Sequence, residues 1–268
     1  MQQRQTSRTP HIKIARADHV GWLYFDNPGR KNAISLDMFA AIPAVLDDFE
    51  SDGDIRVVVM RGAGEESFIS GGDISEFEGK RSTEQSVRNY DATAARAVNA
   101  LERLSKPVIA MIHGFCLGGG VEVALGADLR IAAEDATFGI PASRLGIAYP
   151  LPWVHHLVAL VGPAHASDIL FTGRRLSAQD ACAIGLVNRV VAKTELQATV
   201  DKLAATIAHN APLSIRAARR CIHESVKDPA ERDVALCERL IRDCSASEDH
   251  AEGRRAFLDK RRPEFRGR

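Results

Sequence analysis

A glycine-rich turn between a predicted strand and a predicted helix is the part of the chain best suited to chemistry. The strand is expected over 107–112, the turn over 113–120 and the helix over 121–126. Glycines let main-chain N–H groups approach a ligand closely, and a helix N-terminus adds a partial positive charge. This arrangement would stabilise an anion, or an oxygen that gains negative charge in a transition state. Tight packing of the turn would also explain the glycines, but the sequence patterns of nucleotide-binding loops do not occur in it.

A second glycine-containing loop, over 67–74, makes the first one more informative. It follows another apolar run of strand length at 55–60. Its Gly72 offers a second main-chain N–H, and two donors from adjacent loops can converge on one oxygen atom. Asp73, next to it, is placed to cap the turn. Glu122 lies within the first turn of the helix after the other loop, so its carboxyl could exchange protons near the same point or simply favour the helix dipole.

The elements around these loops alternate between strands and helices. Short β-rich runs at 11–15 and 20–25 predict a hairpin, and Ser35 is placed to cap a helix. A long amphipathic helix is expected over 84–104, and a third buried strand over 129–132. Such alternation requires crossover connections and hence a partly parallel sheet. The last part of the chain has helical periodicity, with helices expected over 164–171, 178–184, 195–208, 213–226 and 233–242.

Composition is that of an ordinary globular protein. The 268 residues are 45% hydrophobic, and 35 Lys and Arg balance 35 Asp and Glu, which gives no reason to expect nucleic acid as a partner. The five cysteines are widely spaced without a C-x-x-C pair, so we expect no disulfide framework, no metal site and a cytoplasmic location. Residues 1–10 are polar and are expected to be disordered. No apolar run approaches the roughly 18 residues that a membrane span needs.

The two glycine loops resemble the two signature segments of the enoyl-CoA hydratase/isomerase (crotonase) family. Further segments that resemble the family follow the same order along the chain, from about residue 11 to the end. They are 27–35, 136–146, 170–188 and 248–265. Collinear matches of this kind are specific to the family, although not to one reaction within it.

The resemblance implies an α/β fold in which β-β-α units form a spiral of two roughly perpendicular sheets, followed by a helical trimerisation region. The spiral core with its acyl-CoA site would occupy 11–200, and the oligomerisation region 201–268. The basic stretch at 254–268 would be a solvated tail or would contact a phosphate. The resemblance further implies a homotrimer or homohexamer. It implies a coenzyme A thioester as substrate, with no separate cofactor and no membrane partner.

Carried over position by position, the resemblance assigns roles to individual residues. The N–H groups of Gly72 and Gly119 would hold the thioester oxygen, and Glu122 would act as a catalytic acid or base. Phe257 and Lys260 would reach the CoA moiety from the terminal helix, often of a neighbouring subunit. The other residues expected along the acyl-CoA are Arg30, Lys31, Ala33, Ser70, Gly71, Asp73, Ile74, Gly118, Pro141 and Ala142.

The sequence departs from the hydratase pattern at one catalytic position. Family hydratases carry Pro-Glu where this chain has Pro141-Ala142, and the missing glutamate is one of two groups that together add water across a Cα=Cβ bond. Decarboxylation needs the same oxyanion site but no strong base. Tyr149 matches an active-site tyrosine of bacterial methylmalonyl-CoA decarboxylases, although those enzymes have histidine at the position of Gly72.

Three interpretations follow from these residues. The first is an enoyl-CoA hydratase-like lyase with Glu122 as the principal acid/base group. The second is a decarboxylase of methylmalonyl-type CoA thioesters with Tyr149 in its site. The third is a non-catalytic protein that binds acyl-CoA, and the intact glycine loops together with Glu122 argue against it.

Overall fold

The larger of two sheets has six strands in the order β1-β2-β3-β5-β7-β10. It belongs to a computed structural model that describes residues 11–76 and 83–268, so the expectation for residues 1–10 lies outside the described part of the chain. β1 and β2 form the expected antiparallel hairpin, and the pairs from β2 to β10 are parallel. The strands are β1 (His11–Ala17), β2 (Val20–Asp26), β3 (Val57–Gly62), β5 (Val108–Ile112), β7 (Leu129–Ala133) and β10 (Arg189–Val191).

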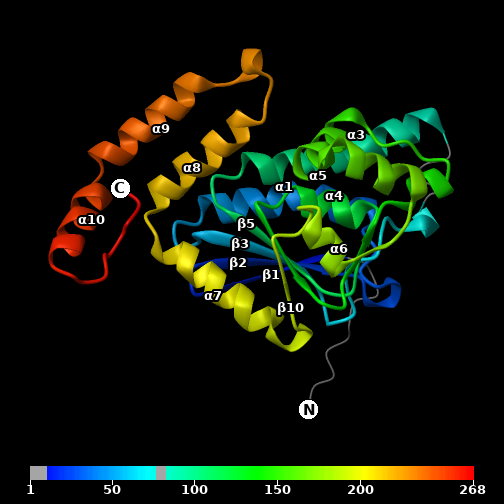
Figure 1. Ribbon diagram of the computed structural model, residues 1–268, viewed down its shortest axis with the longest axis horizontal. Coiled ribbons are helices and arrows are strands. Elements are labelled where there is room, and N and C mark those ends of the chain that lie inside the picture. Colours follow the sequence, from blue (N-terminus) through cyan, green and yellow to red (C-terminus); the bar gives the residue numbers. More distant parts are fainter. Residues whose placement is uncertain (1–10, 77–82) are drawn as a thin grey trace.

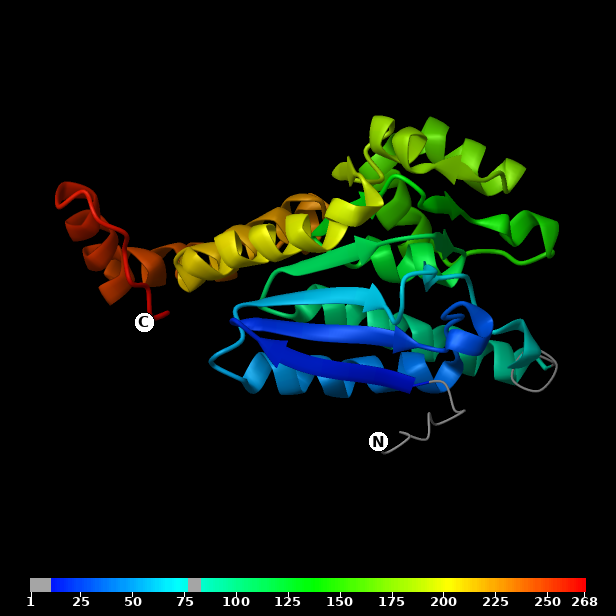
Figure 2. The ribbon, with the colours of Figure 1, turned by 90° about the horizontal axis from the view of Figure 1, so that it is seen from below.

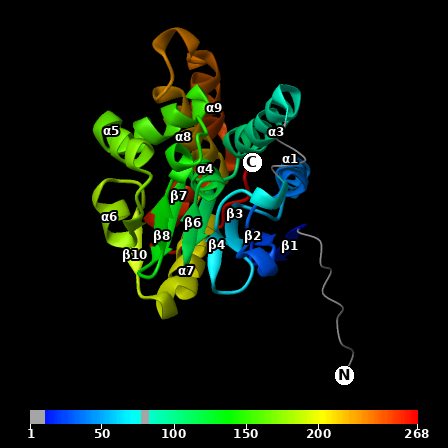
Figure 3. The ribbon, with the colours of Figure 1, turned by 90° about the vertical axis from the view of Figure 1, so that its right-hand side faces the viewer.

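A smaller sheet is built from the segments that directly follow strands of the larger one. β3 leads to β4, β5 leads to β6, and β7 leads to β8, so successive units advance both sheets by one strand. β4, β6 and β8 are parallel to one another, and β9 pairs antiparallel with β8. Figure 3 shows β4, β6 and β8 side by side in this order. Their bounds are β4 (Ser67–Ile69), β6 (Phe115–Leu117), β8 (Thr137–Gly139) and β9 (Leu176–Ser177).

Helices cover both faces of the larger sheet because its strands are apolar on both sides. Val58 belongs to the face that packs against α1 (Leu36–Ser51) and α3 (Glu84–Arg103). Val59, the next residue, points to the opposite face, which is covered by α7 (Leu196–His209). In Figure 1, α1 lies above the strands and α7 below them. Near-continuous burial of this kind is what the apolar runs of the sequence predicted.

Helix starts follow local capping signals. The Oγ atom of Ser35 accepts a hydrogen bond from the amide of Met38, which confirms the predicted cap of α1. Thr83 and Ser86 form reciprocal capping bonds at the start of α3. Helix α4 (Gly119–Leu125) begins two residues before the predicted start. This earlier start makes Gly119 its first residue, and the first amides of a helix have no acceptor within the helix.

The last three helices extend from the sheets and are called the arm (Figures 1 and 2). They are α8 (Pro212–Ser225), α9 (Val234–Ala246) and α10 (Glu248–Leu258). The expected boundary at residue 200 falls inside α7, which still packs on the larger sheet. Buried Arg219 fixes the arm to the core, because its Nε donates to Asp128 at 2.8 Å and its Nη2 donates to the carbonyl of Leu101 at 2.8 Å. The remaining helices are α5 (Leu151–Thr172) and α6 (Ala178–Ala183).

Helix length and apolarity also bear on membrane insertion. Within residues 11–76 and 83–268, none of the helices combines the length and the apolar character that a membrane crossing requires.

Candidate active site

Three loops meet at one edge of the smaller sheet. They follow β4, β6 and β8, whose carboxyl ends share an edge because these strands are parallel neighbours. The first loop carries Ser70, Gly71 and Gly72, the second carries Gly118 and Gly119, and the third carries Pro141 and Ala142. Segments far apart in sequence are therefore brought to one place by strand order alone.

The amides of Gly72 and Gly119 lie close together. The nitrogen of Gly72 is 3.7 Å from the position that a Cβ on Gly119 would take. Around Gly72, the amide of Ile34 donates to the carbonyl of Gly71, and the amide of Asp73 donates to the carbonyl of Ile34. The pairing with Ile34 therefore involves the carbonyl of Gly71 and the amide of Asp73, and not the amide of Gly72. In the described part of the chain, neither the Gly72 nor the Gly119 amide donates to a turn or loop carbonyl.

The turn before α4 depends on Gly118. Its φ of 50° with ψ of −116° is a conformation that residues with a Cβ rarely adopt. Its own amide donates to the carbonyl of Gly139 at 2.8 Å, which ties the turn to the end of β8. Gly119, which begins α4, lies next to the loop after β4, since its Cβ position is 3.7 Å from the nitrogen of Gly72.

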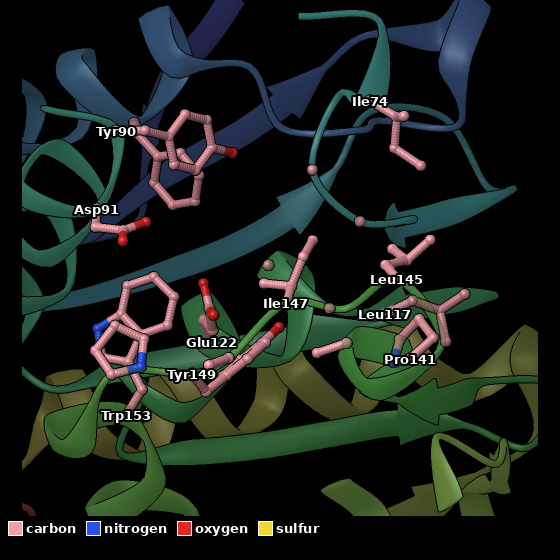
Figure 4. A pocket seen from close by; sticks show the side chains of 18 of the residues that line it. Ile74, Tyr90, Asp91, Leu117, Glu122, Pro141, Leu145, Ile147, Tyr149 and Trp153 are labelled. Atoms are coloured by element: carbon pink, nitrogen blue, oxygen red, sulfur yellow. The ribbon is translucent and has the colours of Figure 1, made fainter. Parts of the chain in front are cut away.

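A cavity of about 150 Å³ opens over these amides. Its wall is mostly apolar, and its acidic side chains are those of Glu122 and Asp91 (Figure 4). The lining residues are Phe39, Ser70, Gly71, Gly72, Ile74, Tyr90, Asp91, Leu117, Gly118, Gly119, Glu122, Pro141, Ala142, Leu145, Ile147, Ala148, Tyr149, Pro150 and Trp153.

Glu122 combines burial with access to this cavity. Its residue surface is 5% exposed, and it lies in the first turn of α4, three residues after Gly119. Figure 4 shows its carboxyl directed into the cavity beside Ile147 and Tyr149. A carboxyl placed here can exchange a proton with a ligand atom next to the two amides.

Tyr149 lies beside Gly118 of the second loop. Its hydroxyl oxygen is 3.8 Å from the position that a Cβ on Gly118 would take. Its ring packs edge-on against Trp153, with ring centroids 5.8 Å apart. The sequence therefore identified a residue of the cavity, although Trp153 was missed.

Most of the residues expected along the acyl-CoA line the cavity or adjoin its first loop. Ser70, Gly71, Ile74, Gly118, Pro141 and Ala142 are lining residues. The Oγ of Ser70 donates to the carbonyl of Arg30, and its amide donates to the carbonyl of Lys31, so the main chain of these two residues adjoins the first loop. The guanidinium of Arg30 pairs with buried Asp73 at 2.9 Å. Ala33 is buried in the same segment.

The Asp73 carboxylate also shapes the first loop. One of its oxygens accepts hydrogen bonds from the amide and the hydroxyl of Ser75, at 3.1 and 2.6 Å. This is the geometry of a turn cap, in keeping with the structural role considered for it.

Phe257 and Lys260 do not meet the cavity within this chain. Phe257 is on α10 and is 83% exposed, and Lys260 follows the end of that helix. Figures 1 and 2 both show α10 at the opposite end of the molecule from α3 and α5, which border the cavity. Contact between these residues and a ligand in the cavity would require a second subunit.

Several cavity residues had no distinguishing signal in the sequence. Phe39 and Tyr90 are apolar-face residues of α1 and α3, and Asp91 is one of three acidic residues of the amphipathic helix α3. A helix pattern gives the face on which such residues lie but not the neighbouring element that they meet.

Titratable groups elsewhere do not form a metal site within residues 11–76 and 83–268, where no three His, Cys, Asp or Glu side chains are grouped to hold an ion.

His113, just before the glycine turn, is buried with an unpaired Nε2. Burial, together with the charges of Arg61 and Lys193, lowers the pKa of this imidazole to about 4. It does not line the cavity.

Comparison with known proteins identifies the family. A sequence profile of the enoyl-CoA hydratase/isomerase family matches residues 16–268. The chain is 33% identical to the short-chain-enoyl-CoA hydratase of Clostridium acetobutylicum, over 95% of this chain and 97% of that protein. It is 35% identical to the carnitinyl-CoA dehydratase of Proteus mirabilis, over 92% of this chain and 94% of that protein.

Solved structures agree with this result. A putative enoyl-CoA hydratase/isomerase family protein from Hyphomonas neptunium superposes with a TM-score of 0.91 at 38% identity, over 96% of this chain and 98% of that one. An enoyl-CoA hydratase/carnithine racemase from Magnetospirillum magneticum also reaches 0.91, at 33% identity over 96% of both chains. The expected crotonase-type α/β fold is thus confirmed. This chain belongs to the enoyl-CoA hydratase/isomerase family.

Proposed function

We propose that this protein is a lyase that adds water to, or removes it from, short acyl-CoA thioesters through a thioester enolate. The observation that carries the proposal is the closeness of Gly72 and Gly119, since the nitrogen of Gly72 lies 3.7 Å from the Cβ position of Gly119. A relative at 33% identity is a short-chain-enoyl-CoA hydratase, and another at 35% is a carnitinyl-CoA dehydratase.

The amides would act on charge that develops at the thioester oxygen. Adding a nucleophile at Cβ, or removing a proton from Cα, transfers negative charge to that oxygen. Two fixed N–H donors stabilise the charge without reorganising, and losing one such donor typically costs about 2.7–4 kcal/mol of transition-state stabilisation. Because Gly119 starts α4, the helix field adds to its hydrogen bond.

Glu122 would move the proton. It is buried next to the amides, and its carboxyl faces the cavity (Figure 4). It can take a proton from water or return one to the carbon skeleton, and a positioned general acid or base contributes about 10²-fold to 10⁴-fold in rate.

The rest of the substrate would lie along the first loop. Arg30 and Lys31 would attract the phosphates of CoA, with Ser70, Gly71, Asp73 and Ile74 beside them. Phe257 and Lys260 would reach the CoA of a neighbouring subunit in a homotrimer or homohexamer. The reaction needs no cofactor beyond the substrate, and we place the protein in the cytoplasm, in keeping with five cysteines that form no disulfide.

Crotonyl-CoA tests this function directly. The protein should remove the conjugated enoyl absorbance, and Glu122→Gln should lower kcat by about 10²-fold to 10⁴-fold. Exposed Glu134 provides a matched control, because Glu134→Gln makes the same chemical change away from the cavity and should leave kcat unchanged. Inert wild-type protein, or equal rates for wild type and Glu122→Gln, would contradict the proposal.

Decarboxylation of a methylmalonyl-type thioester is the second candidate. Two observations favour it: Ala142 provides no carboxyl in the cavity, and the Tyr149 hydroxyl lies 3.8 Å from the Cβ position of Gly118. Release of CO₂ from methylmalonyl-CoA that is lost in Tyr149→Phe would support it. Thermal stabilisation by CoA without turnover of either substrate would instead indicate a binding protein.

A further inference from the structure

A second carboxyl reaches the cavity from a helix that carries none of the expected site residues. Asp91 belongs to α3 and lines the same cavity as Glu122, which belongs to α4. Figure 4 shows Asp91 between Tyr90 and Trp153, on the side of the cavity next to Glu122. The cavity therefore holds a pair of acidic side chains although Ala142 contributes none.

The register of α3 explains how Asp91 reaches the cavity. Tyr90, Ala94 and Ala97 are buried at helical spacing and face the core, and Asp91 is half-buried at the margin of this face. The ring of Tyr90 packs edge-on against Phe39, with centroids 6.1 Å apart. The Phe39 ring in turn comes within 3.7 Å of the Cβ position of Gly119. This chain of contacts fixes the second turn of α3 relative to the oxyanion site.

Aspartate at this position needs an explanation. It is a weak helix former, yet it stands within the interior of α3. Acidic side chains that line a largely apolar cavity are placed to act as general acids or bases on a ligand within it.

We propose that Asp91 is the second acid/base group of the reaction and supplies from α3 the carboxyl that Ala142 does not supply from the loop after β8. The inference rests on the proposed hydration of enoyl-CoA and completes it, because that reaction needs two proton transfers at different atoms of the substrate.

In the forward direction one carboxyl of the pair starts ionised and the other protonated. The ionised carboxylate takes a proton from water as the water oxygen bonds to Cβ, and the π electrons of the Cα=Cβ bond move to the thioester oxygen. The protonated carboxyl then delivers its proton to Cα as the thioester carbonyl reforms. Water has been added, the two carboxyls have exchanged roles, and proton exchange with solvent restores the starting state.

Asp91→Asn tests the proposal, because it keeps the shape of the side chain and removes its acid–base capacity. We expect kcat for crotonyl-CoA hydration to fall about 10²-fold to 10⁴-fold with little change in KM. The pH profile of kcat should also lose one of its two limbs. Glu84→Gln is the matched control, since it alters an exposed carboxyl of the same helix and should leave kcat and the profile unchanged.

Relocating the carboxyl provides a second test that does not depend on a loss. Ala142 is buried and lines the cavity on the side of the third loop. In the Asp91→Asn background, Ala142→Glu should restore kcat at least about tenfold, because it returns a second carboxyl to the site. Asp91→Glu alone should keep most of the activity.

The outcomes separate this inference from the function on which it rests. Wild-type protein that does not hydrate crotonyl-CoA overturns both. Full activity of Asp91→Asn, while Glu122→Gln is impaired, overturns only the role of Asp91. A rise in KM with unchanged kcat also overturns it, since Asp91 would then contact the substrate without transferring a proton.

Discussion

A Cβ on Gly120 would stand 2.9 Å from the Cβ of Ile69, and closer still to the carbonyl oxygen of Ile69. The first turn of α4 therefore rests directly on β4, the strand that leads to Gly72. Because β4 leads to Gly72 and α4 begins at Gly119, this contact fixes the position of one amide donor relative to the other.

Gly120→Ala should for this reason weaken both folding and catalysis. The methyl group forces α4 away from β4, and overpacking of this kind typically costs about 1–3 kcal/mol. Urea unfolding should report the loss of stability, and kcat should fall because Gly119 moves with the helix. Gly53→Ala is the control, since among the described residues no atom other than those of its chain neighbours lies within 4 Å of its Cβ position. If Gly120→Ala is less stable but keeps the kcat of the wild type, the contact between α4 and β4 does not position the two amides for catalysis.

Lys31 should contribute to CoA affinity and not to the chemical step. Its ammonium pairs with Glu66 at 3.1 Å, and its side chain is 50% exposed, so solvent screens its charge. An exposed ionic contact contributes up to about 1 kcal/mol, hence Lys31→Ala should raise KM by about fivefold or less with kcat unchanged. Added salt should shrink the difference. Lys202→Ala, at an exposed position of α7, should behave as wild type. An effect of Lys31→Ala on kcat would contradict this assignment.

His113 should make stability depend on pH. Its pKa is lowered from 6.5 to about 4, so as the pH falls the unfolded chain binds the proton before the folded protein does. Stability is therefore greatest above pH 6.5 and should decline by roughly 3 kcal/mol between pH 6.5 and pH 4. His113→Phe should flatten this part of the curve in urea unfolding, whereas exposed His250→Asn should not. Equal slopes for all three proteins would be incompatible with the burial of His113.

The arm should be an association surface. Ile241, Phe257 and Leu258 expose large apolar side chains on α9 and α10, and such clusters usually mark an interface. We expect sedimentation to give a trimer or hexamer, and Phe257→Asp to shift it to smaller species with a higher KM for acyl-CoA. A fully active monomer would show that Phe257 and Lys260 have no role in the site.

Sequence patterns predicted the elements that carry long periodic signals. The hairpin, the buried strands of the larger sheet and the long helix α3 are present near their predicted bounds, and Ser35 caps α1. β4, β6, β8 and β9 are two or three residues long and span too few alternations to be recognised. α10 lies partly in a basic stretch whose composition also suits a solvated tail.

The site was predicted to the extent that it follows loops with a glycine signature. Gly72, Gly119, Glu122 and Tyr149 lie in segments that the resemblance covers, and all line one cavity. Asp91 reaches that cavity through the packing of α3 on α1, and tertiary placement of this kind leaves no local trace in a helix pattern. The position of Asp91 in the cavity could therefore be recognised only from the three-dimensional structure.

The most direct measurement is a crystal structure with a non-reactive acyl-CoA thioester analogue bound. The account predicts the thioester oxygen about 2.7–3.1 Å from both the Gly72 and the Gly119 nitrogen, with Cα and Cβ between the carboxyls of Glu122 and Asp91. A thioester oxygen bound away from these two amides, or contacting only one of them, would contradict it.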